Sequence, residues 1–527
     1  MIKATLEPEC TGQFSAFFLD YLRQQPSLSP FYKLFPSVEN FGKAVEERNF
    51  SQEKREVLAT ALNEQYQKAG LKCKAVERLR DSRTFTVTTG HQLNLMTGPL
   101  YFIYKIVSTI NLAEKLNKEY PECHFIPVYW MATEDHDFAE INHFNFDGEK
   151  YQWNSQQTGA VGDFVLDDEL KGLLKKWRFL PDFLKDAYES SENLAVAVRK
   201  YVHHLFGEKG LVIVDGHDVK LKQLFAPIIE ADILEGKASE LVQQSTQELE
   251  ELSYKTQVHS REINFFYLDK GLRERIVKVE DSFEVLNTDI KYSESELRKL
   301  IQESPEKFSP NVVMRPVYQE VILPNLAYLG GPAEVVYWLQ LKESFDHYGV
   351  DFPMIMPRNF AMIIDSNSSR KIAKLGVPLK QIFEDFTIWK KAYVKQRSTH
   401  DLTLNDKKEA LTSLMDEIGG QVEGIHPTLK TSSESTKTRM IQIIDHFCKK
   451  VVKAEEKNFS EDLNRMETVK KTLFPKGVPQ ERFNNLLQFY LEDGNFIDKL
   501  FENFDPMNFS YIVLEYQDGE IRTTENL

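Results

Sequence analysis

The chain has 527 residues, of which 42% are hydrophobic and 12% aromatic, so it can form several folded domains and is not disordered. Its 65 Lys and Arg against 80 Asp and Glu give a formal net charge of −15, which disfavours nucleic-acid partners. No stretch approaches the roughly 18 apolar residues of a membrane span, and the first residues, MIKATLEPEC, lack the apolar region of a signal peptide. We therefore expect a globular, cytoplasmic protein without membrane partners.

The clearest regular unit is a strand, a helix and a second strand. The β-branched run Thr84–Thr89 predicts a strand that ends at Gly90. Gly98 and Pro99 then open a predicted helix, since proline suits a first helical turn. The almost wholly apolar segment His124–Met131 predicts a strand that is buried on both faces. Together these elements predict a βαβ crossover and hence a parallel sheet.

Further steps of the same kind follow along the chain. Residues 191–206 predict an amphipathic helix, and LVIVD at 211–215 predicts a short buried strand. The third step spans residues 311–349, where the apolar start NVVMRPV predicts a strand and Gly-Gly-Pro leads into a helix. FPMIMP at 352–357 is another strand candidate. The fold class is therefore α/β, with a Rossmann-like core that carries insertions.

Long charged helices are predicted from about residue 378 to 472. Their apolar positions alternate steps of four and three, the spacing of a coiled coil: Met440, Ile444, Phe447, Val451 and Ala454. GGQVEGIHP at 419–427 predicts the reversal of an antiparallel hairpin. We expect three parts: a Rossmann-like core with insertions (1–377), a helical coiled-coil hairpin (378–472) and a segment that packs back on the core (473–527).

The first segment that can carry chemistry is TTGHQLN, at the carboxyl end of the first predicted strand. Ligands of open α/β sheets bind beyond such strand ends. Gly90 permits a tight turn there, and His91, Gln92 and Asn94 bring polar atoms to the rim. The alternative interpretation is an ordinary loop between a strand and a helix.

The second segment is Glu134-Asp135-His136-Asp137, directly after the buried strand. Like charges this close disfavour joint ionisation unless a ligand ammonium, a metal ion or a neighbouring Arg compensates. The alternative is a helix N-terminus, where the helix dipole favours acids. His143 would lie about 10 Å from His136 along a continuous helix, so the two do not readily share one zinc ion. No metal site is predicted.

The third segment is residues 311–338. Gly330 and Gly331 precede a proline that opens a helix, and the backbone N–H groups there predict an anion site. Arg315 could clamp a carboxylate through two contacts, and Glu334 sits in the first helical turn. The alternative is an efficient junction between a loop and a helix.

These segments resemble the bacillithiol-biosynthesis cysteine-adding family, the cysteine ligases. The matching stretches are TGHQLNLMTGPLYFIYKI, WMATEDHDFAEINH and NVVMRPVYQEVILPNLAYLGGPAEVVYW, in the order and spacing of the family. The helical hairpin and QERFNNLLQF also match, so the resemblance covers nearly the whole chain. His91 departs from the Gln of many relatives and makes TGHQ similar to the nucleotide loop of class I aminoacyl-tRNA synthetases; no KMSKS-like loop accompanies it.

The resemblance implies a ligase that adds L-cysteine to the amine of glucosaminyl-malate, the last step of bacillithiol synthesis. It also implies a homodimer that forms through the coiled coil. The reaction also needs an activated cysteine carboxyl group, for which we expect ATP or another activator. Two alternatives stay open: a catalytically inactive coiled-coil scaffold, and a metal-dependent amide hydrolase that uses His136, Asp137 and His143.

The expected site residues fall into two groups. The candidates for catalysis are His91, Glu134, Asp135, His136 and Asp137. The candidates for substrate binding are Gly90, Gln92, Asn94, Tyr101, Lys105, His143, Arg315, Gln319, Tyr328, Gly330, Gly331, Glu334, Tyr337 and Trp338. The acids would hold an ammonium group or act as a base, while Arg315 and the glycine amides would bind malate carboxylates or a phosphate.

Overall fold

A computed structural model describes residues 2–177 and 180–515 of the chain. The described residues form two compact units. The larger unit comprises residues 2–9, 13–363 and 478–515, and the smaller comprises residues 10–12 and 364–477. In the part of the chain that is described, no helix combines the length and the apolar character needed to cross a membrane.

The larger unit contains a five-stranded sheet in which all strands run parallel. The strands, in spatial order, are β13 (Met354–Pro357), β12 (Asn325–Gly330), β2 (Thr84–His91), β3 (His124–Met131) and β6 (Val212–Asp215). If these five strands are numbered 1 to 5 along the sequence, their spatial order read from β6 to β13 is 3-2-1-4-5, which is the Rossmann order. The predicted Rossmann-like sheet is therefore confirmed. The order reverses between β2 and β12, and ligands of such sheets bind at that reversal.

Helices cover the sheet where the crossovers require them. Helix α5 (Tyr101–Glu119) links β2 to β3, and α9 (Leu194–Phe206) precedes β6, as the sequence predicts. One core cluster packs α5 against the strands: its members include Phe85, Val87, Leu112, Leu116, Phe125, Leu329 and Met356. Burial of such side chains contributes roughly 1.5–3 kcal/mol each before entropy is counted, so this cluster fixes the position of α5 on the sheet.

The expectation for residues 311–349 is wrong in two respects. NVVMRPV does not form a strand but the start of helix α13 (Met314–Ile322), and the strand is β12, further along the chain. The side chain of Asn311 accepts the backbone N–H groups of Val313 and Met314 and so starts the helix. A short apolar run cannot distinguish a buried helix from a buried strand. The helix expected up to Gly349 is divided into α14 (Pro332–Leu339) and α15 (Lys342–His347).

An antiparallel five-stranded sheet is inserted between β6 and β12. Its strands, in spatial order, are β10 (Lys291–Ser293), β9 (Ser282–Val285), β8 (Leu272–Val279), β7 (Phe265–Asp269) and β11 (Phe308–Pro310). A separate three-stranded sheet has the spatial order β1 (Ile2–Leu6), β15 (Tyr511–Glu515) and β14 (Phe360–Ile364), and β1 pairs antiparallel with β15. The two ends of the described chain therefore meet in the larger unit.

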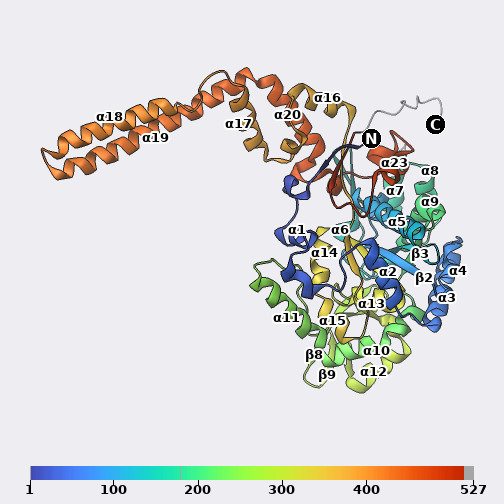
Figure 1. Cartoon of the computed structure of the whole chain (residues 1–527). Helices are drawn as coiled ribbons and strands as arrows, with labels where there is room; N and C mark the ends of the chain where they lie inside the picture. The colour runs from blue at the N-terminus through green and yellow to red at the C-terminus, as the bar shows by residue number, and fades with distance from the viewer. Residues whose placement is uncertain (1, 178–179, 516–527) are drawn as a thin grey trace, which may run out of the picture. The chain divides into compact units, whose positions relative to one another are not determined.

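The smaller unit is helical, and its main feature is a long hairpin. Helices α18 (Asn405–Glu423) and α19 (Pro427–Asn458) pack side by side (Figure 1). The reversal is shorter than expected, because α18 continues to Glu423 and Pro427 already begins α19, a position that suits proline. Helices α17 (Phe386–Arg397) and α20 (Ser460–Leu473) pack beside this hairpin's base.

Candidate active site

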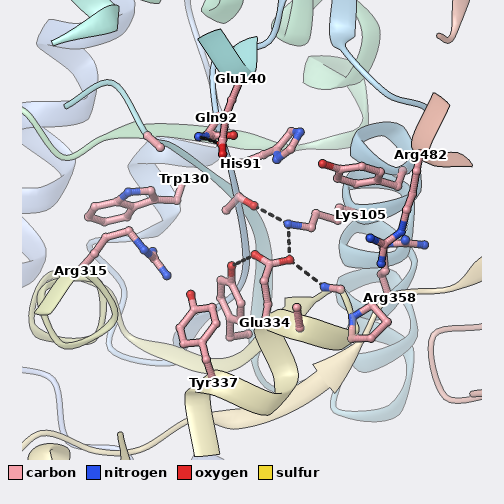
Figure 2. Close-up of a pocket in the computed structure, with 17 residues that line it drawn as sticks. His91, Gln92, Lys105, Trp130, Glu140, Arg315, Glu334, Tyr337, Arg358 and Arg482 are labelled. Carbon is pink, nitrogen blue, oxygen red and sulfur yellow. Dashed lines mark hydrogen bonds and ion pairs between the residues drawn. The ribbon is translucent and has the colours of Figure 1, made fainter. Parts of the chain in front are cut away.

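A cavity of about 400 Å³ opens at the carboxyl ends of β2 and β12, where the strand order reverses (Figure 2). This volume lies within the 300–1,000 Å³ that small-molecule sites usually have. The cavity is lined by Gly90, His91, Gln92, Tyr101, Lys105, Trp130, Ala132, Glu140, Arg315, Tyr328, Gly331, Pro332, Ala333, Glu334, Tyr337, Arg358 and Arg482. The predicted first and third segments therefore meet at one site.

An ion pair forms the centre of the cavity floor. Lys105 Nζ lies 2.5 Å from Glu334 Oε2 and donates a hydrogen bond of 2.9 Å to the carbonyl of Gly90. Glu334 also accepts the hydroxyl of Tyr328 and the backbone N–H of Gly331, each at 2.7 Å. Burial acts to raise the pKa of Glu334, but Lys105 and these donors hold that pKa below its ordinary value. Glu334 is therefore a carboxylate at neutral pH.

This pair changes the prediction for the Gly-Gly-Pro turn. The N–H of Gly331, expected to bind a ligand anion, already donates to the carboxylate of Glu334 in the same helix. Gly330 must be glycine, because a Cβ there would lie 2.8 Å from Cβ of Glu334. The turn is thus a capped helix start that positions Glu334, and other groups must bind an anionic ligand.

Arg315 is such a group. Its Nη1 donates to Gln319 Oε1 at 3.0 Å, while its Nη2 is buried and has no hydrogen-bond partner among the described residues. The guanidinium lies 5.6–5.9 Å from the rings of Trp130, Tyr328 and Trp338. No carboxylate of the described chain lies within ion-pair distance of it. A guanidinium removed from water favours an anionic partner, so Arg315 is available to a ligand carboxylate.

Two further arginines line the opposite side of the cavity (Figure 2). Arg358 forms a two-contact ion pair with Glu481, with N–O distances of 3.0 and 2.5 Å, and both side chains are buried. Arg482 directly follows Glu481 in the sequence, and its side chain is exposed at the cavity's edge. The sequence analysis did not predict either arginine as a site residue, although QERFNNLLQF, which contains Arg482, is one of the matching stretches.

The same C-terminal segment holds the loop before α5. Asn485 Nδ2 donates to the carbonyls of Met96 and Gly98, at 2.6 and 2.7 Å. Met96, Thr97 and Gly98 all have left-handed φ angles of 49, 70 and 61°, a conformation that costs free energy in the first two residues. Because α5 begins three residues later and carries Tyr101 and Lys105, Asn485 supports the cavity indirectly.

His91 is the last residue of β2, and Gly90 lies inside that strand rather than in the expected turn. The imidazole stacks on Phe102 with ring centroids 5.0 Å apart. Burial, assisted by the charge of Lys105, lowers the pKa of His91 to about 3. The ring is therefore neutral at physiological pH, so it can exchange a hydrogen bond with a ligand but cannot act as a standing positive charge.

The acidic block does not form one cluster. Glu134 pairs with Lys222, whose Nζ lies 2.7 Å from Oε1 and is fully buried. Asp135 accepts Gln92 Nε2 at 2.8 Å and the backbone N–H of His136 at 2.7 Å. The compensating donors predicted for these acids therefore come from the protein itself. Asp135 is connected to the cavity through the side chain of Gln92, and Asp137 through the backbone N–H of Glu140.

The rest of the block has structural partners. Asp137 caps the short helix α6 (Phe138–Ile141), which supports the alternative interpretation for that residue. His136 contacts the guanidinium of Arg273, and burial together with that charge lowers the pKa of His136. His143 begins strand β4 (His143–Phe146), so the two histidines do not share a helix. Within the described ranges, no three His, Cys, Asp or Glu residues are grouped to hold a metal ion.

The cavity brings many of the predicted site residues together: Gly90, His91, Gln92, Tyr101, Lys105, Arg315, Tyr328, Gly331, Glu334 and Tyr337. The remaining predicted residues do not line it: Asn94, Glu134, Asp135, His136, Asp137, His143, Gln319, Gly330 and Trp338. Sequence reasoning missed seven lining residues: Trp130, Ala132, Glu140, Pro332, Ala333, Arg358 and Arg482. Trp130, Ala132 and Glu140 stand in the matching block WMATEDHDFAEINH, so a signal for them existed.

Comparison with known proteins covers the whole described fold. Residues 1–359 match the family described as bacillithiol biosynthesis BshC, N-terminal Rossmann-like domain, and residues 361–516 match its C-terminal coiled-coil domain. A Flavobacterium psychrophilum protein named "Putative cysteine ligase BshC" is 40% identical over 96% of this chain and 98% of its own length. Proteins of the same name from Cytophaga hutchinsonii and Chlorobaculum tepidum are 38% and 29% identical, over 96% and 85% of this chain and 97% and 85% of their own lengths.

Proposed function

The chain belongs to the BshC family of bacillithiol-biosynthesis proteins, and we propose that it is a cysteine ligase that joins L-cysteine to the amine of glucosaminyl-malate. The reaction forms an amide bond between the cysteine carboxyl carbon and the sugar amine. It needs an activated carboxyl group and a deprotonated amine. The cavity at the strand reversal is the proposed site of that reaction.

The charges of the cavity support this substrate pair. Four lining side chains are cationic and two are acidic: Lys105, Arg315, Arg358 and Arg482, against Glu140 and Glu334. Because Glu334 and Glu481 neutralise two of the cations, Arg315 and Arg482 are left to face anions. The malate group carries two carboxylates and cysteine carries one, so both substrates offer suitable partners. Positioning of two reactants in this way lowers the barrier to condensation.

The rim of the cavity that contains Gln92 and Glu140 suits the amine of a substrate. Gln92 Nε2 donates to Asp135 Oδ2 and to Glu140 Oε2, both at 2.8 Å. These two carboxylates lie beside neutral His91 at the end of β2. In our proposal Glu140 holds an incoming ammonium group, Asp135 adds negative charge behind it through Gln92, and His91 orients the group through a hydrogen bond. ATP is the proposed activator; its phosphates would bind Arg482 at the cavity's edge, and ATP would supply the leaving group of the activated carboxyl.

The observation that carries the proposal is the buried Arg315, which has no acid partner within residues 2–177 and 180–515. The test is thiol profiling of a strain that lacks the gene, complemented with the wild-type chain or with Arg315→Ala. We expect the deletion strain to accumulate glucosaminyl-malate and to lack bacillithiol, and only the wild-type gene to restore the thiol. Bacillithiol in the deletion strain would contradict the ligase function and favour the inactive scaffold, whereas restoration by Arg315→Ala would contradict the role of Arg315 in the site.

We also propose that the hairpin joins two copies of the chain. Met440 and Phe447, two members of the predicted seam, stay 39% and 55% exposed beside α18, and Ile443 is 68% exposed. A second hairpin would cover this stripe. Sedimentation of the full chain should give a dimer, and Phe447→Lys should give a monomer.

A further inference from the structure

Behind Arg315 lies a chain of buried polar side chains that does not reach the cavity. Gln319 accepts Nη1 of Arg315 at 3.0 Å and donates its own Nε2 to Glu320 Oε1 at 2.8 Å. Asn325 Nδ2 donates to the same oxygen at 2.7 Å. Gln319, Glu320 and Asn325 are 0–2% exposed, and none of them lines the cavity. They can therefore affect a ligand only through Arg315.

The positions of the donors and acceptors fix the direction of this series of hydrogen bonds. Oε1 of Glu320 accepts from two amides, so the N–H₂ end of Gln319 must point to Glu320. The oxygen of Gln319 then points to Arg315, which has donors only. The Asn325 amide is held in turn by the hydroxyl of Thr88, which donates to its Oδ1 at 2.8 Å. The chain thus connects β2, β12 and α13 at the strand reversal.

The far end of the chain is anchored by Arg48, which follows helix α2 (Val38–Glu47). Its Nη2 donates to the backbone carbonyls of Glu320 and Leu323, at 2.8 and 2.7 Å, and lies 3.8 Å from Glu320 Oε2. The Arg48 side chain is 5% exposed. Because both ends are buried and hydrogen-bonded, the Gln319 amide has one available orientation.

We propose that Gln319 and Glu320 are positioning residues: they hold the guanidinium of Arg315 at the angle at which it receives a substrate carboxylate. The inference rests on the proposed function, since that function supplies the carboxylate. The rings of Trp130, Tyr328 and Trp338 restrict how far the Arg315 guanidinium can lie from them. They do not restrict its rotation about Nε, because cation–π attraction is not a directional hydrogen bond. Gln319 supplies a directional contact from the side away from the cavity, and the hydroxyl of Tyr337 interacts with the guanidinium as well.

The test measures L-malate binding to the purified full chain by isothermal titration calorimetry. Gln319→Met should weaken L-malate binding about tenfold, the effect of losing one hydrogen bond to a charged group. Glu320→Leu should act in the same direction, whereas Glu320→Gln keeps an oxygen for the two amides and should restore most of the affinity. The matched control is Gln340→Met: Gln340 is also fully buried and hydrogen-bonded, but it lies at the far end of α14.

A second variant covers the case in which Gln319→Met does not fold. Gln319→Glu keeps the size of the side chain and gives Arg315 an internal carboxylate, but it removes the amide that donates to Glu320. L-malate affinity should fall, and circular dichroism checks that the variant is folded. Wild-type affinity in a folded Gln319→Met or Gln319→Glu protein, with lost affinity in Arg315→Met, would overturn the positioning role alone. Unchanged affinity in Arg315→Met, or no binding by the unaltered chain, would overturn the substrate assignment as well.

Discussion

Each side of the cavity carries a buried arginine, and the two arginines have different partners. Arg358, on the side of the C-terminal segment, holds Glu481 through two contacts. Arg315, on the side of α13, donates to the neutral amide of Gln319 and leaves Nη2 without a partner among the described residues. A guanidinium paired with its own acid stabilises the fold, whereas one held by an amide keeps its charge for a ligand. The comparison separates a structural arginine from a functional one.

The largest effect on stability is expected for Arg358→Met. This change leaves the carboxylate of Glu481 buried without its cation, which costs about 3–5 kcal/mol in other proteins. Urea denaturation of the full chain should show this loss as a lower free energy of unfolding of the larger unit. Lys299→Met, which removes an exposed cation of the same unit, is the control and should leave the midpoint unchanged. Equal midpoints for both variants would mean that Arg358 is not a structural arginine.

The buried acid behind Arg315 should make stability depend on pH. Burial raises the pKa of Glu320 from 4.5 to about 7. The folded state favours the protonated carboxyl of Glu320. Its contribution to the free energy of unfolding is therefore complete below pH 4.5 and is lost as the pH rises to about 7. That difference corresponds to roughly 3 kcal/mol. Denaturation at several pH values should show this slope in the wild type and its absence in Glu320→Gln; the same slope in both would contradict the assignment.

Asn485→Leu tests the support that the C-terminal segment gives to α5. The variant leaves the carbonyls of Met96 and Gly98 buried without their donor, which costs about 1–3 kcal/mol. Hydrogen exchange should show faster opening of residues 95–105. Asn503→Leu is the control; Asn503 lies in the same segment, and its Nδ2 donates to the carbonyl of Lys499 in its own helix. Unchanged exchange in Asn485→Leu would show that the loop holds its left-handed residues by itself.

The smallest effect on stability, and the largest on activity, is expected for Arg315→Met. Removing a buried charge that lacks an internal acid should change the free energy of unfolding by less than about 1 kcal/mol, and can raise it. Amide formation should fall at least about 30-fold, because a charged hydrogen bond to the substrate is lost. Purified enzyme assayed with both substrates tests this. A large loss of stability would remove the contrast with Arg358.

Local patterns predicted much of the fold because they act over short distances. Strand β3 has the predicted bounds, since eight nearly apolar residues in a row suit only a buried element. The strand expected from NVVMRPV is wrong because the side chain of Asn311, one residue, accepts the N–H groups of Val313 and Met314 and so favours a helix. The capping of Gly331 by Glu334 was readable from the three-residue spacing. Arg358 and Glu481 lie 123 residues apart, so no local pattern could have paired them.

The C-terminal wall of the cavity has a consequence for how the site comes into being during translation. All five parallel strands leave the ribosome before residues 480–485 do, and the whole hairpin is synthesised between them. A nascent chain can therefore complete its Rossmann sheet before Glu481 is available to pair with Arg358 and before Asn485 is available to bind the 95–98 loop. Ribosomes that stall within the hairpin would release products with a finished sheet and an unfinished cavity.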